Sequence, residues 1–264
     1  MTLRPSRILR ELRAGQAPTC FKLNLGDPRV IELCGLAGAS AVWICNEHVC
    51  NDWFNLENQI RAAKLYDVDT IVRVEKGSYS DYIKPLESDA TAIMVPHVTT
   101  AEEAGHVVQM TRFHPLGRRA ADGGNADGRY CQVPLREYMA HSNQERLLIL
   151  EIESPEALAN VEAIAAVPGY EMLLFGPGDF AHLIGKPGQL EAPEVLAARQ
   201  RVGAAARKHG KFAMIPGMMA PRATLEAEGY QVFTLGADVL GLGDYFKARL
   251  EAFEKQAHYG DVST

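Results

Sequence analysis

Short runs of β-branched and other apolar residues recur along the chain, and each is followed by a segment whose apolar residues have helical spacing. Eight such runs predict strands at 19–25, 41–45, 70–75, 91–97, 147–153, 171–175, 211–215 and 231–235. Helices are predicted at 28–38, 53–66, 78–88, 100–113, 154–166, 193–209, 221–229 and 244–257. Proline at the first helical position marks several of these starts, as in Asp27-Pro28 and Ser154-Pro155.

This alternation predicts an α/β fold, a single (β/α)8 TIM barrel over residues 1–264, because parallel strands need crossover helices and eight such units close into a barrel. A doubly wound open sheet is the alternative. Against it, the sequence has no G-x-G-x-x-G loop after the first strand and no G-x-x-x-x-G-K-[ST] loop. The irregular stretch 114–134 is too long for a plain connector, and we expect it to be an active-site or interface loop.

The N-terminal segment has four arginines at three-residue spacing, which places them along one face of a helix and three apolar residues on another. An organelle transit sequence is the less favoured interpretation, because such sequences are poor in acid and Glu11 interrupts the basic pattern. We therefore expect a solvated N-terminal helix. The arginines are Arg4, Arg7, Arg10 and Arg13, and the apolar residues are Ile8, Leu9 and Leu12.

Composition and charge narrow the class of protein. Apolar residues make up 47% of the chain and charged residues 23%, which is typical of a soluble globular domain. The formal net charge of −6 argues against a nucleic-acid partner. We find no apolar segment long enough for a membrane span or a secretory signal, so no membrane partner is expected. Five cysteines at irregular spacing do not describe a disulfide framework, and a cytoplasmic location is expected.

Polar residues occur at the ends of four predicted strands, where a barrel places its reactive groups. They include His48, Arg73, Glu153 and Asp179. Because Glu153 and Asp179 come from neighbouring strands, we expect their carboxylates to lie close together and to need a cation. Two carboxylates, with the other ligands left to water or substrate, favour Mg²⁺ or Mn²⁺ over a structural zinc. Glu151 is expected to point to the same side of its strand as Glu153 and to support the site.

Gly178 directly precedes Asp179 at the start of the segment that follows the sixth strand. With no side chain, its backbone N–H can approach an anionic ligand closely at a helix N-terminus. A glycine that serves only the tight turn is an equally valid interpretation of the local sequence.

The chain resembles the HpcH/HpaI aldolase family, the metal-dependent class II aldolases that cleave 4-hydroxy-2-oxo acids. The resemblance extends over nearly the whole chain. It is carried by LRAGQAP, IELCGLAGAS, the EH of NEH, IVRV, IMVPHV, TRFHPLGRR, LEIES, LLFGPGDFA and FTLGAD. The E-I-E and G-P-x-D segments at these barrel positions are the most specific of these motifs.

The resemblance implies a role for each candidate residue. Glu153 and Asp179 match ligands of a divalent metal cation (Mg²⁺, Mn²⁺ or Co²⁺), and His48 matches the catalytic base. Arg73 matches the residue that binds the pyruvyl oxygen and stabilises the enolate, and Gly178 the position whose backbone N–H binds the substrate carboxylate. The implied partners are a small 2-oxo acid and an aldehyde.

The resemblance also implies an assembly. Members of the family are usually homohexamers, arranged as trimers of dimers, in which the C-terminal helix is exchanged between subunits. In this chain the exchanged element would be the predicted helix at 244–257.

One departure from the family concerns the residue that orients His48. Most members carry Asp at the position of Cys45, and a thiol is only a weak hydrogen-bond partner. We therefore expect either that another carboxylate, Glu47 or Asp52, supports His48, or that its function as a base is weakened.

Several alternatives stay open at this stage. Lys22 and Asn24 occupy positions where many relatives have apolar or small residues, so the substrate is not determined. A binding or regulatory protein that keeps the pocket without the base is one competing hypothesis, and a citryl-CoA-type lyase is another, although no basic groove for a CoA phosphate is evident. A zinc site formed by Cys45, His48 and Cys50 is a third, but it lacks an evident fourth ligand.

Overall fold

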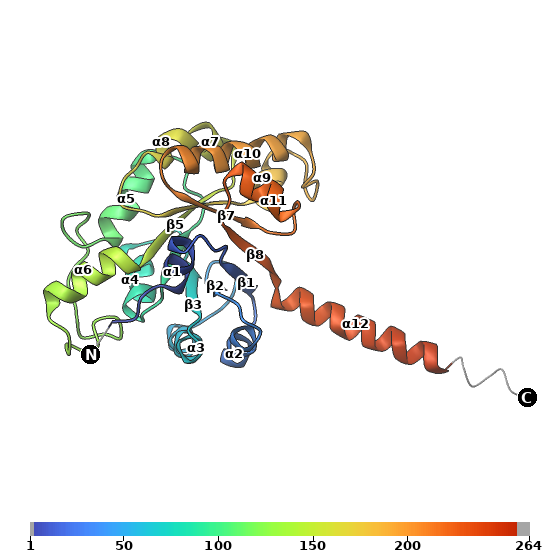
Figure 1. The fold of residues 1–264 in the computed structure, drawn as a ribbon, viewed down its shortest axis with the longest axis horizontal. Helices are drawn as coiled ribbons and strands as arrows, with labels where there is room; N and C mark the ends of the chain where they lie inside the picture. The colour runs from blue at the N-terminus through green and yellow to red at the C-terminus, as the bar shows by residue number, and fades with distance from the viewer. Residues whose placement is uncertain (1–2, 258–264) are drawn as a thin grey trace, which may run out of the picture.

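The computed structural model describes residues 3–257 and contains a closed barrel of eight parallel strands in sequential order (Figure 1). The strands are β1 (Thr19–Leu23), β2 (Ala41–Cys45), β3 (Asp69–Arg73), β4 (Ala92–Val95), β5 (Leu147–Ile152), β6 (Met172–Phe175), β7 (Phe212–Pro216) and β8 (Val232–Ala237). Pairing of β8 with β1 closes the barrel. The predicted TIM-barrel fold and its eight strands are confirmed, and the open doubly wound sheet is excluded.

Helices connect and surround these strands. They are α1 (Arg7–Arg13), α2 (Pro28–Leu36), α3 (Trp53–Leu65), α4 (Tyr79–Glu87), α5 (Ala101–Thr111), α6 (Leu135–Glu145), α7 (Pro155–Ala159), α8 (Val161–Ala165), α9 (Pro177–Leu183), α10 (Pro193–Lys208), α11 (Arg222–Glu228) and α12 (Asp238–Ala257). The sequence pattern does not predict α6 or α9, and it joins α7 and α8 into one helix. In the described part of the chain, no helix combines the length and the apolar character needed to span a membrane.

The alternation of side chains along the strands produces two apolar layers. Inward-facing residues of the strands fill the barrel, while the opposite faces pack against the surrounding helices in a larger layer. Arg73 comes two residues after Ile71, and Glu151 comes two residues after Ile149, which are both in the barrel interior. The same alternation therefore directs Arg73 and Glu151 inward at the carboxyl end of the barrel, where TIM barrels carry their active sites.

The N-terminal helix α1 corrects one expectation, because it is not a solvated helix. Its residues Ile8 and Leu9 are buried with the barrel interior. Asp69, fully buried at the start of β3, accepts hydrogen bonds from the Ser6 hydroxyl and the Ile8 backbone N–H, both at 2.8 Å. The four arginines form the ion pairs Arg4–Asp69, Arg7–Glu11, Arg10–Asp67 and Arg13–Glu145. Helix α1 thus covers the end of the barrel opposite to the mouth.

The long stretch 114–134 does not line the mouth of its own barrel. It follows α5 and leads into α6, so it begins at the amino end of the barrel, away from the mouth. The buried Arg119 anchors it by donating hydrogen bonds to Asp127 at 2.9 Å and to the Tyr138 hydroxyl at 3.1 Å. None of its residues lines the mouth cavity described below. Its role as an active-site or interface loop therefore stays a prediction.

Candidate active site

A cavity of about 370 Å³ opens at the carboxyl ends of the strands. Four of the predicted site residues line it, namely Arg73, Glu153, Gly178 and Asp179. Glu151 lines it too, and the remaining wall includes Lys22, Trp43, Leu190, Met218 and Thr234. The structure therefore brings together residues from β3 and β5 and from the segments that directly follow β5 and β6, which are far apart in the sequence.

Arg73 ends β3, and only 5% of its side chain is exposed. Its guanidinium carbon lies 4.8 Å from the centroid of the Trp43 ring. Its Nη2 donates a hydrogen bond to Cys45 Sγ at 3.1 Å, and its Nη1 lies 3.6 Å from Glu151 Oε2. Its Nε is 2.9 Å from Glu47 Oε2 but is not aligned for a hydrogen bond. Because a thiol is a weak acceptor, Arg73 retains donor capacity for a ligand oxygen.

Neighbouring side chains stabilise the positive charge of Arg73. Burial opposes this charge, but the electrostatic interactions of Arg73 with Glu151, Cys45 and Glu47, together with its hydrogen bond to Cys45, outweigh the effect and raise the pKa of Arg73. The guanidinium is therefore a permanent positive charge inside the cavity, where a low dielectric strengthens its interaction with an anion.

Glu151 and Glu153 form the acidic side of the cavity. Burial and the negative charge of Glu153 raise the pKa of Glu151 well above its ordinary range, and neither of its carboxyl oxygens has a hydrogen-bond partner. Burial also raises the pKa of Glu153, against the hydrogen bond from the His97 backbone N–H, and the charge of Asp179 adds to the increase. These acidic groups repel one another, and a cation bound between them would relieve the repulsion.

Glu153 and Asp179 fit a divalent cation that draws its other ligands from water and substrate. A Cβ at Gly176 would lie 2.9 Å from Glu153 Oε2, so the absence of a side chain there makes room for this carboxylate. The space beside Gly178 is open, and Asp179 is exposed at the mouth. Within residues 3–257, no group of three or more His, Cys, Asp or Glu side chains is arranged to hold a metal ion. An incomplete set of oxygen ligands is typical of Mg²⁺ sites.

His48 does not line the cavity that contains Arg73. Its side chain is 59% exposed and borders a neighbouring cavity of about 410 Å³. Glu47 lies between the two cavities, because its Oε2 is 3.5 Å from His48 Nε2 and 2.9 Å from Arg73 Nε. Asp52 instead caps α3 by accepting a hydrogen bond from the Asn55 backbone N–H at 2.8 Å. Of the two carboxylates considered as partners of His48, the structure places Glu47 beside it.

His97 is a residue of this site that the sequence analysis missed. Its Nδ1 lies 3.0 Å from Glu153 Oε1, and its Nε2 lies 3.4 Å from Glu47 Oε1. Its backbone N–H donates to the same Glu153 oxygen at 2.7 Å. Its φ of +53° is uncommon for a residue with a side chain. The signal was present in the sequence, because His97 ends an apolar run just as Arg73 does.

The zinc hypothesis based on Cys45, His48 and Cys50 is not supported. Cys45 is buried, and its sulfur accepts a hydrogen bond from Arg73 and, at 3.5 Å, from the His48 backbone N–H. Cys50 is exposed. These three side chains form no metal-binding cluster in the described part of the chain.

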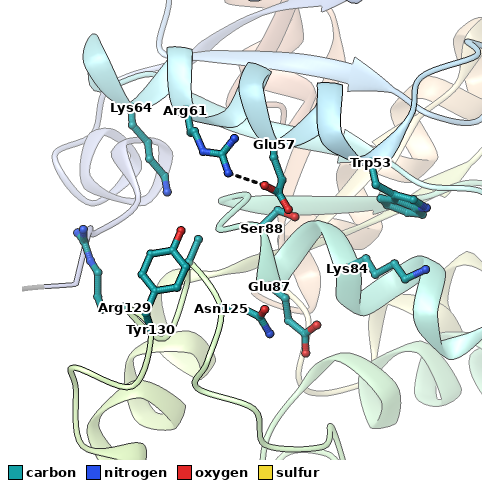
Figure 2. Close-up of a pocket in the computed structure, with 11 residues that line it drawn as sticks. Trp53, Glu57, Arg61, Lys64, Lys84, Glu87, Ser88, Asn125, Arg129 and Tyr130 are labelled. Atoms are coloured by element: carbon teal, nitrogen blue, oxygen red, sulfur yellow. Dashed lines mark hydrogen bonds and ion pairs between the residues drawn. The ribbon is translucent and has the colours of Figure 1, made fainter.

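A larger cavity, of about 600 Å³, lies outside the barrel between α3, α4 and the loop 114–134 (Figure 2). Figure 2 shows Arg61 directed at Glu57, with which it forms an ion pair at 2.5 Å. Lys84 lies over the Trp53 ring, 5.0 Å from its centroid. None of the lining residues belongs to the carboxyl end of a strand, so this cavity is not the candidate active site.

The chain is similar in sequence and in fold to known proteins. Residues 20–242 match the family model described as HpcH/HpaI aldolase/citrate lyase. The 5-keto-4-deoxy-D-glucarate aldolase of Klebsiella pneumoniae subsp. pneumoniae is 32% identical, over 96% of this chain and 96% of that protein. The hydroxypyruvate/pyruvate aldolase of Pseudomonas aeruginosa is 32% identical, over 81% of this chain and 80% of that protein. The crystal structure of the citrate synthase SbnG has a TM-score of 0.87 at 28% identity and covers 94% of this chain and 98% of its own.

Proposed function

Because this chain belongs to the HpcH/HpaI aldolase/citrate lyase family and is a carbon–carbon lyase of the aldolase type, we propose that it cleaves or forms a bond in a 4-hydroxy-2-oxo acid. Cleavage would yield pyruvate and an aldehyde. The supporting observation is that the buried guanidinium of Arg73, with unused donors, shares one cavity with Glu153 and Asp179. A small 2-oxo acid needs such a combination of cationic and metal-binding groups.

The chemistry of the reaction assigns the roles. Cleavage removes a proton from the 4-hydroxyl, breaks the C3–C4 bond and leaves the electron pair on an enolate of pyruvate. The site must therefore supply a base and positive charge where the enolate oxygen develops. A divalent cation held by Glu153 and Asp179 would supply Lewis-acid stabilisation of that oxygen. Arg73 donates hydrogen bonds to it, and the backbone N–H of Gly178 binds the substrate carboxylate.

We assign removal of the hydroxyl proton to His48. Its exposed ring lies beside Glu47, which is in turn beside Arg73, so the base sits at the border of the cavity. A general base acts either directly or through one water molecule, and the latter suits a ring outside the cavity wall. Glu47 thus takes over the supporting position that the family's Asp would hold and that Cys45 cannot fill.

The proposal is tested by incubating the protein with pyruvate, a panel of aldehydes and Mg²⁺, Mn²⁺ or Co²⁺, and by detecting aldol adducts with NMR. We expect adducts with at least one aldehyde and none after chelation of the metal. His48→Ala should lose adduct formation and keep metal binding. The absence of product with every aldehyde, in a protein shown to bind metal, would contradict the aldolase proposal and favour a binding protein with the same fold.

We also propose that α12 packs on a second copy of the chain, in dimers that assemble into a homohexamer. Figure 1 shows α12 projecting away from the barrel. It exposes Leu240, Phe246 and Leu250, while α2 exposes Leu33 and Leu36 on the barrel itself. Exposed apolar surface of this kind is typical of a protein interface.

Two substitutions on α12 test this assembly. The double variant Phe246→Glu with Leu250→Glu should shift the protein from hexamer to smaller species in light scattering after size-exclusion chromatography. Charged side chains in an apolar interface would be buried without partners, which is unfavourable. Glu251→Gln on the same helix serves as the control and should leave the mass unchanged. A monomeric wild-type protein would refute the proposal.

A further inference from the structure

Lys22 presents an ammonium group to the same cavity as Arg73. It lies near the end of β1, where its register partners are Trp43 of β2 and Ala237 of β8. Its side chain lines the cavity, and its Nζ is 5.3 Å from the centroid of the Trp43 ring. The inward direction agrees with the strand alternation, because Cys20, two residues earlier, is in the barrel interior.

Among residues 3–257, Lys22 contacts the Trp43 ring and forms no ion pair with an acidic side chain. The carboxylate next to its register partner is Asp238. This carboxylate accepts the backbone N–H groups of Asn24 and Leu25, each at 2.9 Å. An ammonium group that is partly removed from water and has no counter-charge is unfavourable, so an anionic ligand would stabilise it.

Lys22 and the carboxylates proposed to hold the metal come from different parts of the barrel wall. In the closed barrel, β1 is four strands from β5 in either direction and therefore lies across the mouth from it. Glu153 directly follows β5, and Asp179 is in α9 after β6. A substrate whose 2-oxo acid end is bound near Asp179 would extend its other end across the cavity toward Lys22.

We propose that Lys22 is a specificity-determining residue that binds a carboxylate on the aldehyde portion of the substrate. This inference rests on the proposed aldolase function and adds the residue that recognises the second half of the substrate. A single ammonium group beside Trp43, Leu190 and Met218 suits a carboxylate, whereas a phosphate dianion would call for more donors. A neutral aldehyde leaves the charge of Lys22 without a partner.

The test compares aldehydes that differ in charge at similar length. The pairs are glyoxylate with methylglyoxal, and succinic semialdehyde with butanal, each added to pyruvate in the presence of Mg²⁺ or Mn²⁺. The measured quantity is the ratio of kcat/KM for the charged over the neutral aldehyde. In Lys22→Met we expect this ratio to fall on the order of 10- to 100-fold, which is the worth of one charged hydrogen bond in a partly buried site. Lys22→Arg keeps the positive charge and should retain part of the preference for the charged aldehyde.

A matched control is Lys208→Met, because Lys208 is an exposed cation on α10 that pairs with Glu162 at 2.8 Å and does not line the cavity. The ratio measured for this control should equal that of the wild type. An equal fall in Lys208→Met would mean a general charge effect and would overturn the proposal. An unchanged ratio in Lys22→Met would also overturn the proposal.

Exchange of the pyruvate methyl protons with deuterated water separates this proposal from the aldolase function, because it needs enolate formation and no aldehyde. Suppose that the wild type and Lys22→Met both catalyse exchange and have the same ratio of kcat/KM for the charged over the neutral aldehyde. The role of Lys22 is then refuted and the aldolase function stands. If the wild type catalyses neither exchange nor addition, the aldolase function fails, and the role of Lys22 fails with it.

Discussion

Replacing Arg73 by lysine is expected to lower kcat/KM for cleavage of a 4-hydroxy-2-oxo acid by about 100-fold or more. The guanidinium is planar, lies against the Trp43 ring and directs its donors into the cavity. Lysine keeps the positive charge but places it at one point, so it cannot donate to the enolate oxygen from the same plane. Steady-state measurement of pyruvate release at saturating metal concentration checks this expectation.

Arg61→Lys is the control for this prediction. Arg61 lies on α3, outside the barrel, and pairs with the exposed Glu57, so its substitution should leave kcat/KM within about twofold of the wild type. Urea unfolding of both variants shows whether the fold is intact. If Arg73→Lys is folded and retains full turnover, Arg73 serves only the ion pairs around Glu47 and Glu151.

Asp179→Ala should abolish metal-dependent activity and weaken binding of Mn²⁺ by about 100-fold or more, because it removes one of only two carboxylates proposed as ligands. Asp179 is exposed at the mouth, so its loss should change the free energy of unfolding little. Isothermal titration with Mn²⁺ measures the affinity, and adduct formation from pyruvate measures the activity.

The affinity of the wild-type protein for Mn²⁺ should also fall as the pH is lowered, because protons compete for Glu153, whose pKa is raised by burial.

Glu156→Ala provides a closely matched control. Glu156 is an exposed acid in the first turn of α7, which follows β5, just as Asp179 is in the first turn of α9 after β6. Both substitutions remove the same favourable interaction with a helix N-terminus. Only the loss of Asp179 should affect the metal. Undiminished Mn²⁺ affinity in Asp179→Ala would exclude Asp179 as a ligand.

The barrel could be predicted because its signals are local. An apolar run of strand length, a proline at a helix start and a helical repeat each depend on residues close together in the sequence. Helix α6 escaped prediction because Tyr138 and Ser142 are its only buried residues, so it has almost no apolar stripe. Helix α9 has seven residues, which is too short for a periodicity to appear.

The contents of the mouth could be predicted only in part. The rule that polar residues at strand ends face a common mouth correctly grouped Arg73 with Glu153, Gly178 and Asp179. The same rule grouped His48 with them, but His48 is in the segment after β2 and lies in the adjacent cavity. The path of a loop depends on contacts with distant residues, which a local pattern does not contain.

The sequence by itself determined the order of the strands, the inward positions along them and the family. Only the tertiary structure decided which charges are neutralised. Arg4 and Arg13, which a helical pattern exposes to solvent, pair with Asp69 and Glu145 from distant elements, whereas Lys22 reaches the cavity without such a partner. The reason is physical: the direction of a side chain follows from the local backbone repeat, while burial and charge pairing depend on distances that exist only after the barrel has closed.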